Sequence, residues 1–137
     1  MTAERIPVGN LKDFRLNEFR TVKIPGGSIG VVRTERGFFA IRNRCPHQGA
    51  ELCSGNVTST LEPGDGPFSY RSGMEHMVVR CPWHRWEFAI DSGEAVGQIT
   101  TKKVVTYAVE VDGDVVFVNR RSKAAIAAAR AHAEATA

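Results

Sequence analysis

The chain has 137 residues, of which 42% are hydrophobic and 24% charged, and this fits one soluble globular domain and hardly two. Its apolar runs are far shorter than the roughly 20 residues of a membrane span, and Met1 to Val8 contains no hydrophobic signal core. Three cysteines cannot all pair, so we expect reduced thiols and a cytoplasmic protein.

The formal net charge of +3 does not indicate a nucleic-acid-binding protein. Residues 120–137 carry four cations, Arg120, Arg121, Lys123 and Arg130, against Glu134, and the remaining residues hold fourteen charges of each sign. A neutral body with a basic tail lacks the clustered basic face that neutralises phosphates. We therefore expect neither a nucleic acid nor a membrane as partner.

The first 43 residues alternate short apolar runs with turn residues, which is typical of an all-β protein. The expected elements are a helical turn at Asn10–Phe14 and strands at Phe19–Ile24, Ile29–Arg33 and Phe38–Arg42. Pro25-Gly26-Gly27 provides the first turn, and Gly37 supplies the positive φ of the next hairpin loop.

The middle of the chain, from Asn43 to Gly97, is dense in Gly, Pro, Cys and His and has too little apolar periodicity to form a core by itself. Within it, Ser59 to Met74 contains Pro63-Gly64-Asp65-Gly66-Pro67. This predicts a turn-rich excursion that is too long for an ordinary connection.

The β pattern returns near the end of the sequence. Val104–Val111 and Asp114–Val118 are expected to form a hairpin with Asp112-Gly113 as a two-residue type I′ turn. Ser122 to Ala137 is rich in Ala, which favours a helix, yet Ile126 is its only large apolar residue. We expect this segment to fray or to order against a neighbour.

Two short stretches carry the chemical signal, and each places a His soon after a Cys. Cys45-Pro46-His47 has the form C-x-H, and Cys81-Pro82-Trp83-His84 has the form C-x2-H. Thiolate and imidazole ligands select iron–sulfur clusters, zinc or copper, and two such pairs provide four ligands.

Three metal centres compete for these four ligands. Structural zinc usually takes C-x2-4-C with H-x3-5-H, so two mixed pairs fit it poorly. Blue copper takes two His, one Cys and a weak Met, which leaves the second Cys unexplained. A [2Fe-2S] centre with two Cys and two His uses every ligand.

With these motifs the sequence resembles the Rieske family, over roughly Arg5 to Asn119. The resemblance implies an all-β fold with antiparallel sheets in a sandwich-like or barrel-like base and a smaller inserted cluster-binding subdomain. It also implies one Rieske-type [2Fe-2S] cluster, with Cys45 and Cys81 on the inner iron and His47 and His84 on the outer iron. The expected organisation is a Rieske domain at 1–121, its cluster-binding part at about 43–97, and a tail at 122–137.

Departures from the family's subtypes indicate a low-potential member. Respiratory Rieske proteins have an extra Cys in each loop, where this chain has Ala50 and Trp83, so no loop disulfide is expected. They also have hydroxyl donors at the positions of Trp86 and Phe88. Fewer hydrogen bonds to the cluster disfavour the added electron, which predicts a potential near −150 mV rather than +300 mV, about the low end of the range. Arg85 stands where relatives commonly have Gly, and its charge favours reduction.

The remaining candidate residues have ordinary interpretations beside functional ones. Cys53 is expected to be a small buried residue and no ligand, and His76 and His132 to face solvent. Trp83 and Trp86 are expected to pack over the cluster. The residues Arg42, Arg44 and Arg85 are either a docking face for an acidic redox partner or ordinary solvated charges, because Glu51 and Glu87 are close in sequence.

The resemblance implies one-electron transfer as a ferredoxin, from a flavin-dependent reductase to a terminal oxygenase or similar enzyme, with no substrate turnover by this chain. A Rieske oxygenase needs a second iron held by two His and a carboxylate, and only two further His residues remain. The alternatives are a tightly bound Rieske subunit and a non-redox regulatory or binding subunit of a multicomponent enzyme. The four intact ligands argue against a non-redox subunit.

Overall fold

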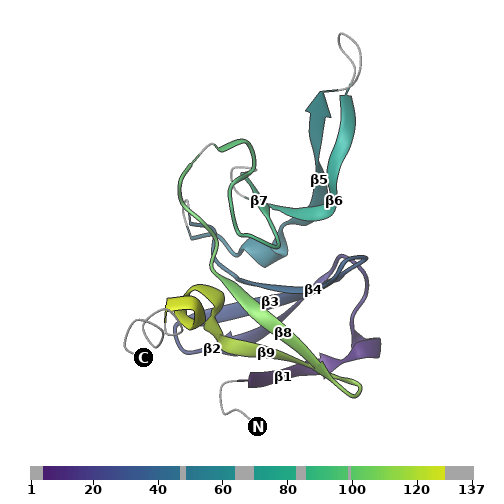
Figure 1. The fold of residues 1–137 in the computed structure, drawn as a ribbon, viewed down its shortest axis with the longest axis vertical. Helices are drawn as coiled ribbons and strands as arrows, with labels where there is room; N and C mark the ends of the chain where they lie inside the picture. Colours follow the sequence, from purple (N-terminus) through teal and green to yellow (C-terminus); the bar gives the residue numbers. More distant parts are fainter. Residues whose placement is uncertain (1–4, 47–48, 64–69, 83–85, 99, 129–137) are drawn as a thin grey trace.

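The computed structural model describes residues 5–46, 49–63, 70–82, 86–98 and 100–128, which form two antiparallel sheets (Figure 1). The first has six strands in the order β1-β9-β8-β4-β3-β2, and the second has three in the order β5-β6-β7. The first sheet contains β1 (Arg5–Asn10), β2 (Phe19–Ile24), β3 (Gly27–Thr34), β4 (Gly37–Arg42), β8 (Thr106–Asp112) and β9 (Val115–Ser122). The second contains β5 (Asn56–Pro63), β6 (Tyr70–Arg80) and β7 (Glu87–Ala89). Short 3-10 helices are η1 (Leu11–Asp13), η2 (Leu52–Ser54) and η3 (Val96–Gln98), and residues 123–128 are α-helical.

The six-stranded sheet curls until its two edge strands nearly meet. The side chain of Arg20 on β2 donates a 2.8 Å hydrogen bond from Nε to the carbonyl oxygen of Val8 on β1. A methyl group at Gly9 would lie 3.0 Å from the same nitrogen, so the edges approach closely here. The sheet is therefore a nearly closed barrel, with little unpaired edge exposed.

Strands β3 and β4 are shared between two hydrophobic cores. Ile29, Val31 and Ala40 point into the barrel, where they pack with Phe14, Tyr107, Val116 and Val118. Val32 and Ile41, one residue out of phase, belong to the second core on the other face of the sheet. Because successive strand residues face opposite sides, both faces of these two strands are buried. The three-stranded sheet lies over this outer face (Figure 1).

Most expectations for the base of the fold are confirmed. The all-β class is correct, the helical turn is η1, and the strand expected at Phe19–Ile24 is β2. Gly26 has φ +84° and Gly37 has φ +119°, as their turns require. The type I′ turn at Asp112-Gly113 is wrong: Asp112 pairs with Val115, so the loop is Gly113-Asp114. Only Gly113 has positive φ there, which matches a type II′ turn.

The excursion expected at Ser59–Met74 is largely a β-hairpin. Strand β5 pairs with β6 as far as Pro63↔Tyr70, and the ribbon stands away from the rest of the fold in Figure 1. The pairing shifts between Thr58 and Thr60, where β6 takes up extra residues. Within the described residues, no helix is long and apolar enough to cross a membrane.

Candidate metal centre

Cys45 and Cys81 each open a six-residue loop that a backbone hydrogen bond closes. The amide of Cys45 donates to the carbonyl of Ala50, and the amide of Cys81 donates to that of Trp86, both at 2.8 Å. The first loop follows β4, and the second joins β6 to β7. The two cysteines therefore occupy the same position in loops closed in the same way.

Backbone hydrogen bonds hold the two ends of the first loop, whose residues 47 and 48 lie outside the described part of the chain. The amide of Gly49 donates to the carbonyl of Cys45, and Gly49 has φ +77°. A third loop at residues 89–94 repeats both hydrogen bonds, with Gly93 at φ +76°, and contains no cysteine. The hydrogen bonds at the ends of the first loop are therefore a backbone pattern that this chain also forms where it has no cysteine.

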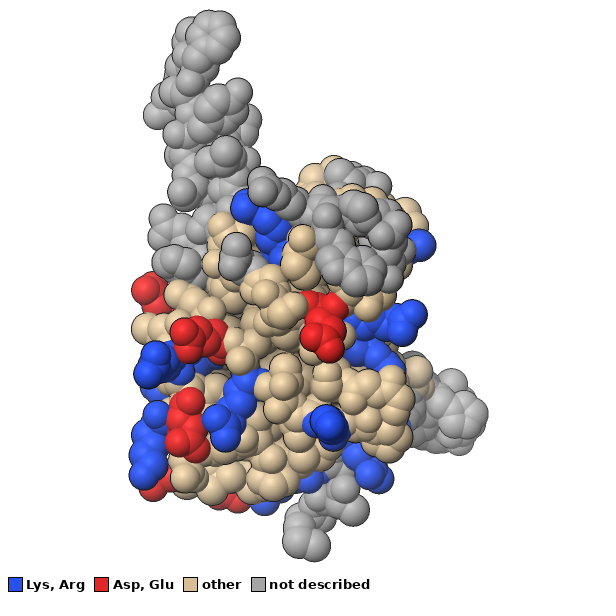
Figure 2. Space-filling view, turned by 180° about the vertical axis from the view of Figure 1, so that it is seen from behind, with Lys and Arg blue, Asp and Glu red and all other residues tan. Residues whose placement is uncertain are grey.

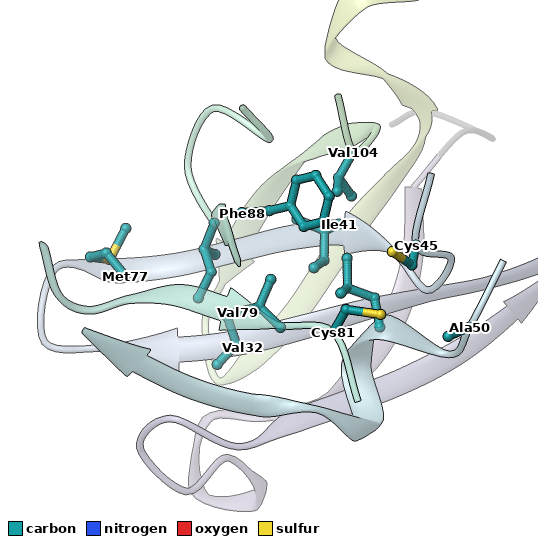
Figure 3. Close-up of a cluster of buried hydrophobic side chains, with 11 residues drawn as sticks. Val32, Ile41, Cys45, Ala50, Met77, Val79, Cys81, Phe88 and Val104 are labelled. Carbon is teal, nitrogen blue, oxygen red and sulfur yellow. The ribbon is translucent and has the colours of Figure 1, made fainter. Parts of the chain in front are cut away.

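Both thiols are buried in the outer core. Cys45 and Cys81 are each 1% exposed and share one hydrophobic cluster with Ala50, Leu52, Val79 and Phe88. In the view of Figure 3 their sulfur atoms lie at the same end of this cluster. None of the three cysteines forms a disulfide. Two separate loops therefore deliver two thiols to one apolar environment.

Gly55 and an ion pair fix the second loop relative to the first. The segment after the first loop, η2 and Gly55, packs on the end of β6, and a methyl group at Gly55 would overlap the carbonyl oxygen of Arg80. Arg80 pairs with Glu87 across the base of the second loop, with Nη2 and Oε2 at 2.8 Å and Nε and Oε2 at 3.2 Å. Sequence reasoning missed these contacts because nothing in the motifs indicates which strand the glycine touches.

Cys53 lies beside the site and supports the wall between the two cores. Its amide donates to Oδ1 of Asn43 at 2.7 Å, and its side chain packs partly buried against the outer core. A methyl group at Gly30 would overlap the sulfur of Cys53, so this glycine on β3 makes room for the thiol. Burial, with a smaller effect from Glu51, raises the pKa of Cys53 from 9.0 to about 12. The thiol is therefore protonated at neutral pH.

The raised pKa predicts that Cys53 is unreactive in the folded protein. At pH 9 the thiolate fraction of Cys53 should be roughly 500-fold lower in the folded than in the unfolded chain, because only the thiolate reacts. The folded chain binds the proton more tightly, so stability should fall as pH rises from about 9 toward 12. Iodoacetamide labelling at pH 9 with peptide mapping measures the reactivity of Cys53. Equal labelling rates of Cys53 with and without urea would contradict it.

The side chains of the two arginines near the first loop, Arg42 and Arg44, point to different parts of the structure. Arg42 turns toward the β2–β3 turn, with Nη2 3.5 Å from the carbonyl oxygen of Gly26. The guanidinium of Arg44 instead lies against Gly49 in the loop itself, since a methyl group there would be 3.3 Å from Nη2. Trp86 is partly buried against the outer core, as expected of a residue that packs over the site. The other predicted site residues, His47, Trp83, His84 and Arg85, lie outside the described residues, as do His132 and the side chain of His76.

The two buried thiols fit an iron–sulfur cluster. Thiolate sulfur is the ligand type that such clusters require, and the two thiols come from separate loops into a core that excludes water. Backbone hydrogen bonds close both loops at their ends and so hold the two cysteines in place. Fold and site together define an all-β protein with a cluster-binding subdomain on a barrel.

Comparison with known proteins identifies the family. Residues 4–108 match the model of the Rieske [2Fe-2S] domain, and the chain belongs to this family. Its cofactor is one Rieske-type [2Fe-2S] cluster.

Among curated relatives, a carnitine monooxygenase oxygenase subunit of Acinetobacter baumannii is 31% identical over 60% of this chain, which spans only 18% of that protein's length. The ferredoxin component of the naphthalene 1,2-dioxygenase/salicylate 5-hydroxylase systems of Ralstonia sp is 26% identical over 82% of this chain and 91% of its own. Among solved structures, a complex of reduced oxygenase and oxidized ferredoxin in carbazole 1,9a-dioxygenase contains a chain of the same fold. Its TM-score is 0.70 at 22% identity, over 89% of this chain and 98% of that one.

Proposed function

We propose that the protein is a Rieske ferredoxin that carries single electrons from a flavin-dependent reductase to a terminal oxygenase or a related enzyme. The observation that carries this proposal is the pair of matching loops that bury Cys45 and Cys81 in one core. The carrier role is supported by the similarity to a ferredoxin component of a dioxygenase system, which the match covers over 91% of its length. On this proposal the chain turns over no substrate itself.

The proposed ligands are Cys45 and Cys81 for the inner iron and His47 and His84 for the outer iron. When bound, the cluster accepts and releases one electron. The chain's part is to exclude water from the sulfur ligands, both 1% exposed, and to hold their loops by backbone hydrogen bonds. A centre held in this way needs little rearrangement between its two oxidation states.

We further propose a reduction potential near the low end of the Rieske range, about −150 mV. Phe88 is fully buried in the outer core and Trp86 packs against it, and neither side chain has a hydroxyl to donate. Hydrogen bonds to the cluster stabilise its reduced, more negative form, so their loss lowers the potential. We also propose a cytoplasmic location, in which the three thiols stay reduced.

Metal analysis and spectroscopy test this function. The protein purified without oxygen should be red-brown, contain iron and inorganic sulfide at about two each per chain, and give the anisotropic EPR signal of mixed Cys and His ligation when reduced. Redox titration should show reversible one-electron reduction near the proposed potential. A colourless protein that contains zinc and no sulfide after anaerobic reconstitution would exclude the proposal.

A further inference from the structure

The charges of the barrel are divided between its two ends. Three segments meet at the end next to the first ligand loop, and they contain six cations and no Asp or Glu. We call these segments, residues 43–44, 100–105 and 120–128, the basic edge. Its cations are Arg44, Lys102, Lys103, Arg120, Arg121 and Lys123.

Backbone contacts bring these three segments together. The amide of Arg42 donates to the carbonyl of Val105 at 2.8 Å, which joins the segment before β8 to the end of β4. Tyr107 pairs with Ser122, which places the end of β9 and the helix at residues 123–128 beside the same end. Arg44 extends the edge onto the ligand loop, because its guanidinium lies against Gly49.

The opposite end of the barrel has the reverse balance. Three segments at this end, residues 11–18, 35–36 and 110–114, contain six acids and three cations, and Arg5 pairs with two of the acids, Glu110 and Asp112. The acids are Asp13, Glu18, Glu35, Glu110, Asp112 and Asp114. In the rear view of Figure 2, Lys and Arg predominate on one side of the barrel and both signs mix on the other. The net charge of the protein hides this asymmetry.

Part of the positive charge at the basic edge is not neutralised by carboxylates of the described residues. Lys103 faces Glu94 at 3.4 Å, but both side chains are more than 60% exposed, so the pair is weak. Glu87 forms an ion pair with Arg80, and Glu51 directly follows the first ligand loop. Among the described residues, no carboxylate lies within ion-pair distance of Arg44, Lys102 or Lys123. These cations are available to a partner.

We propose that the basic edge docks an acidic redox protein and thereby orients it toward the first ligand loop. This rests on the proposed electron-transfer function, since only a redox partner must approach the cluster closely. Long-range attraction between opposite charges raises association rates by about 10 to 1,000-fold and is screened over roughly 10 Å at 0.1 M salt. The acidic far end disfavours the reversed orientation of such a partner.

Two charge-reversed variants of the cluster-containing protein distinguish the effect of the basic edge from the effect of net charge. The edge variant combines Lys102→Glu, Arg120→Glu and Lys123→Glu. The matched control combines Lys12→Glu, Arg15→Glu and Arg36→Glu at the far end. Each changes the net charge by six units, from +3 to −3. All six side chains are exposed, so both variants should keep the fold and the visible spectrum of the cluster.

The probes are two haem proteins of opposite charge, the acidic cytochrome b5 and the basic cytochrome c, mixed with the reduced protein in a stopped-flow instrument. With cytochrome b5, the edge variant should lower the second-order rate constant at low salt at least about tenfold and remove its salt dependence, and the control variant should change it less than about threefold. With cytochrome c, the edge variant should be faster than wild type.

The outcomes distinguish this inference from the proposed function. If both variants changed the rate constant with cytochrome b5 equally, or not at all, the docking role of the basic edge would be wrong. The proposed electron-transfer function would still stand. A protein without a cluster, or one that reduces neither cytochrome, would overturn the proposed function itself. Fluorescence anisotropy with labelled duplex DNA measures whether the same edge binds nucleic acid. The protein could bind DNA, lose this binding in the edge variant alone, and show no effect of that variant on the rate with cytochrome b5. This result would show that the basic edge binds nucleic acid and not an acidic protein.

Discussion

Replacing Cys81 with serine is expected to abolish the cluster. The hydroxyl oxygen is a hard ligand that does not replace a thiolate on iron, and loss of a ligand should weaken metal binding by at least about a hundredfold. Cys81 is 1% exposed, so the new hydroxyl is also buried in an apolar core, at a cost of about 1–3 kcal/mol if it finds no partner. Iron and sulfide content, with the visible spectrum, measures the loss.

Cys53→Ser is the matched control for this experiment. It makes the same atomic change at the third cysteine, which packs against the same hydrophobic cluster but lies next to Gly30, outside both ligand loops. This variant should keep its iron and sulfide. Retention of the cluster in Cys81→Ser, or its loss in Cys53→Ser, would show that the ligand assignment is wrong.

The base of the fold was predictable where burial follows a regular period. Short apolar runs between turn residues predict β2, β3 and β4, and β3 contains a continuous apolar run. That run, Ile29 to Val32, is fully buried because the strand separates two cores. The sequence shows the run but not its cause, since a large part of the second core, from Met77 to Val104, lies more than 40 positions away.

Four strands, β1, β5, β6 and β7, are not among the expected elements, and two of them, β1 and the outer part of β5, do not lie between two packed layers. β1 contains Pro7, which normally argues against a strand, yet β1 lies at an edge of the sheet, where a missing donor is tolerated. The outer part of β5 pairs only with β6 and stands away from the barrel, so no apolar alternation was needed there. Its Ser, Thr and Pro residues were therefore interpreted as an excursion.

Some features of the site follow from local sequence, and others depend on contacts between distant segments. The spacing of Cys and His within each loop is a local property, and it predicted the cofactor that the family match supports. The close approach of Gly55 to Arg80 and of Gly30 to Cys53 depends on how distant segments pack, and a single sequence contains no signal for it. Such contacts nevertheless hold the loops in place.

Gly55→Ala is expected to damage the site without changing any ligand. A methyl group there would overlap the carbonyl oxygen of Arg80, the residue directly before Cys81. The backbone of one segment must then move away from the other, and overpacking of this kind costs about 1–3 kcal/mol. Since η2 and Gly55 follow the first ligand loop, this movement separates the loops that carry the two thiols. We expect the melting temperature to fall by at least about 3 °C and the sulfide content after reconstitution to decrease.

Gly27→Ala is the control, because Gly27 has no positive φ and its nearest neighbour, a flexible nitrogen of Arg42, would lie 3.6 Å from the methyl group. This variant should match wild type in both measurements. If Gly55→Ala also kept its melting temperature and its full complement of sulfide, the packing of Gly55 on Arg80 would not set the relation between the two ligand loops. A loss of cluster without a loss of stability would instead place the effect in the loops alone, because the barrel is held by its own core.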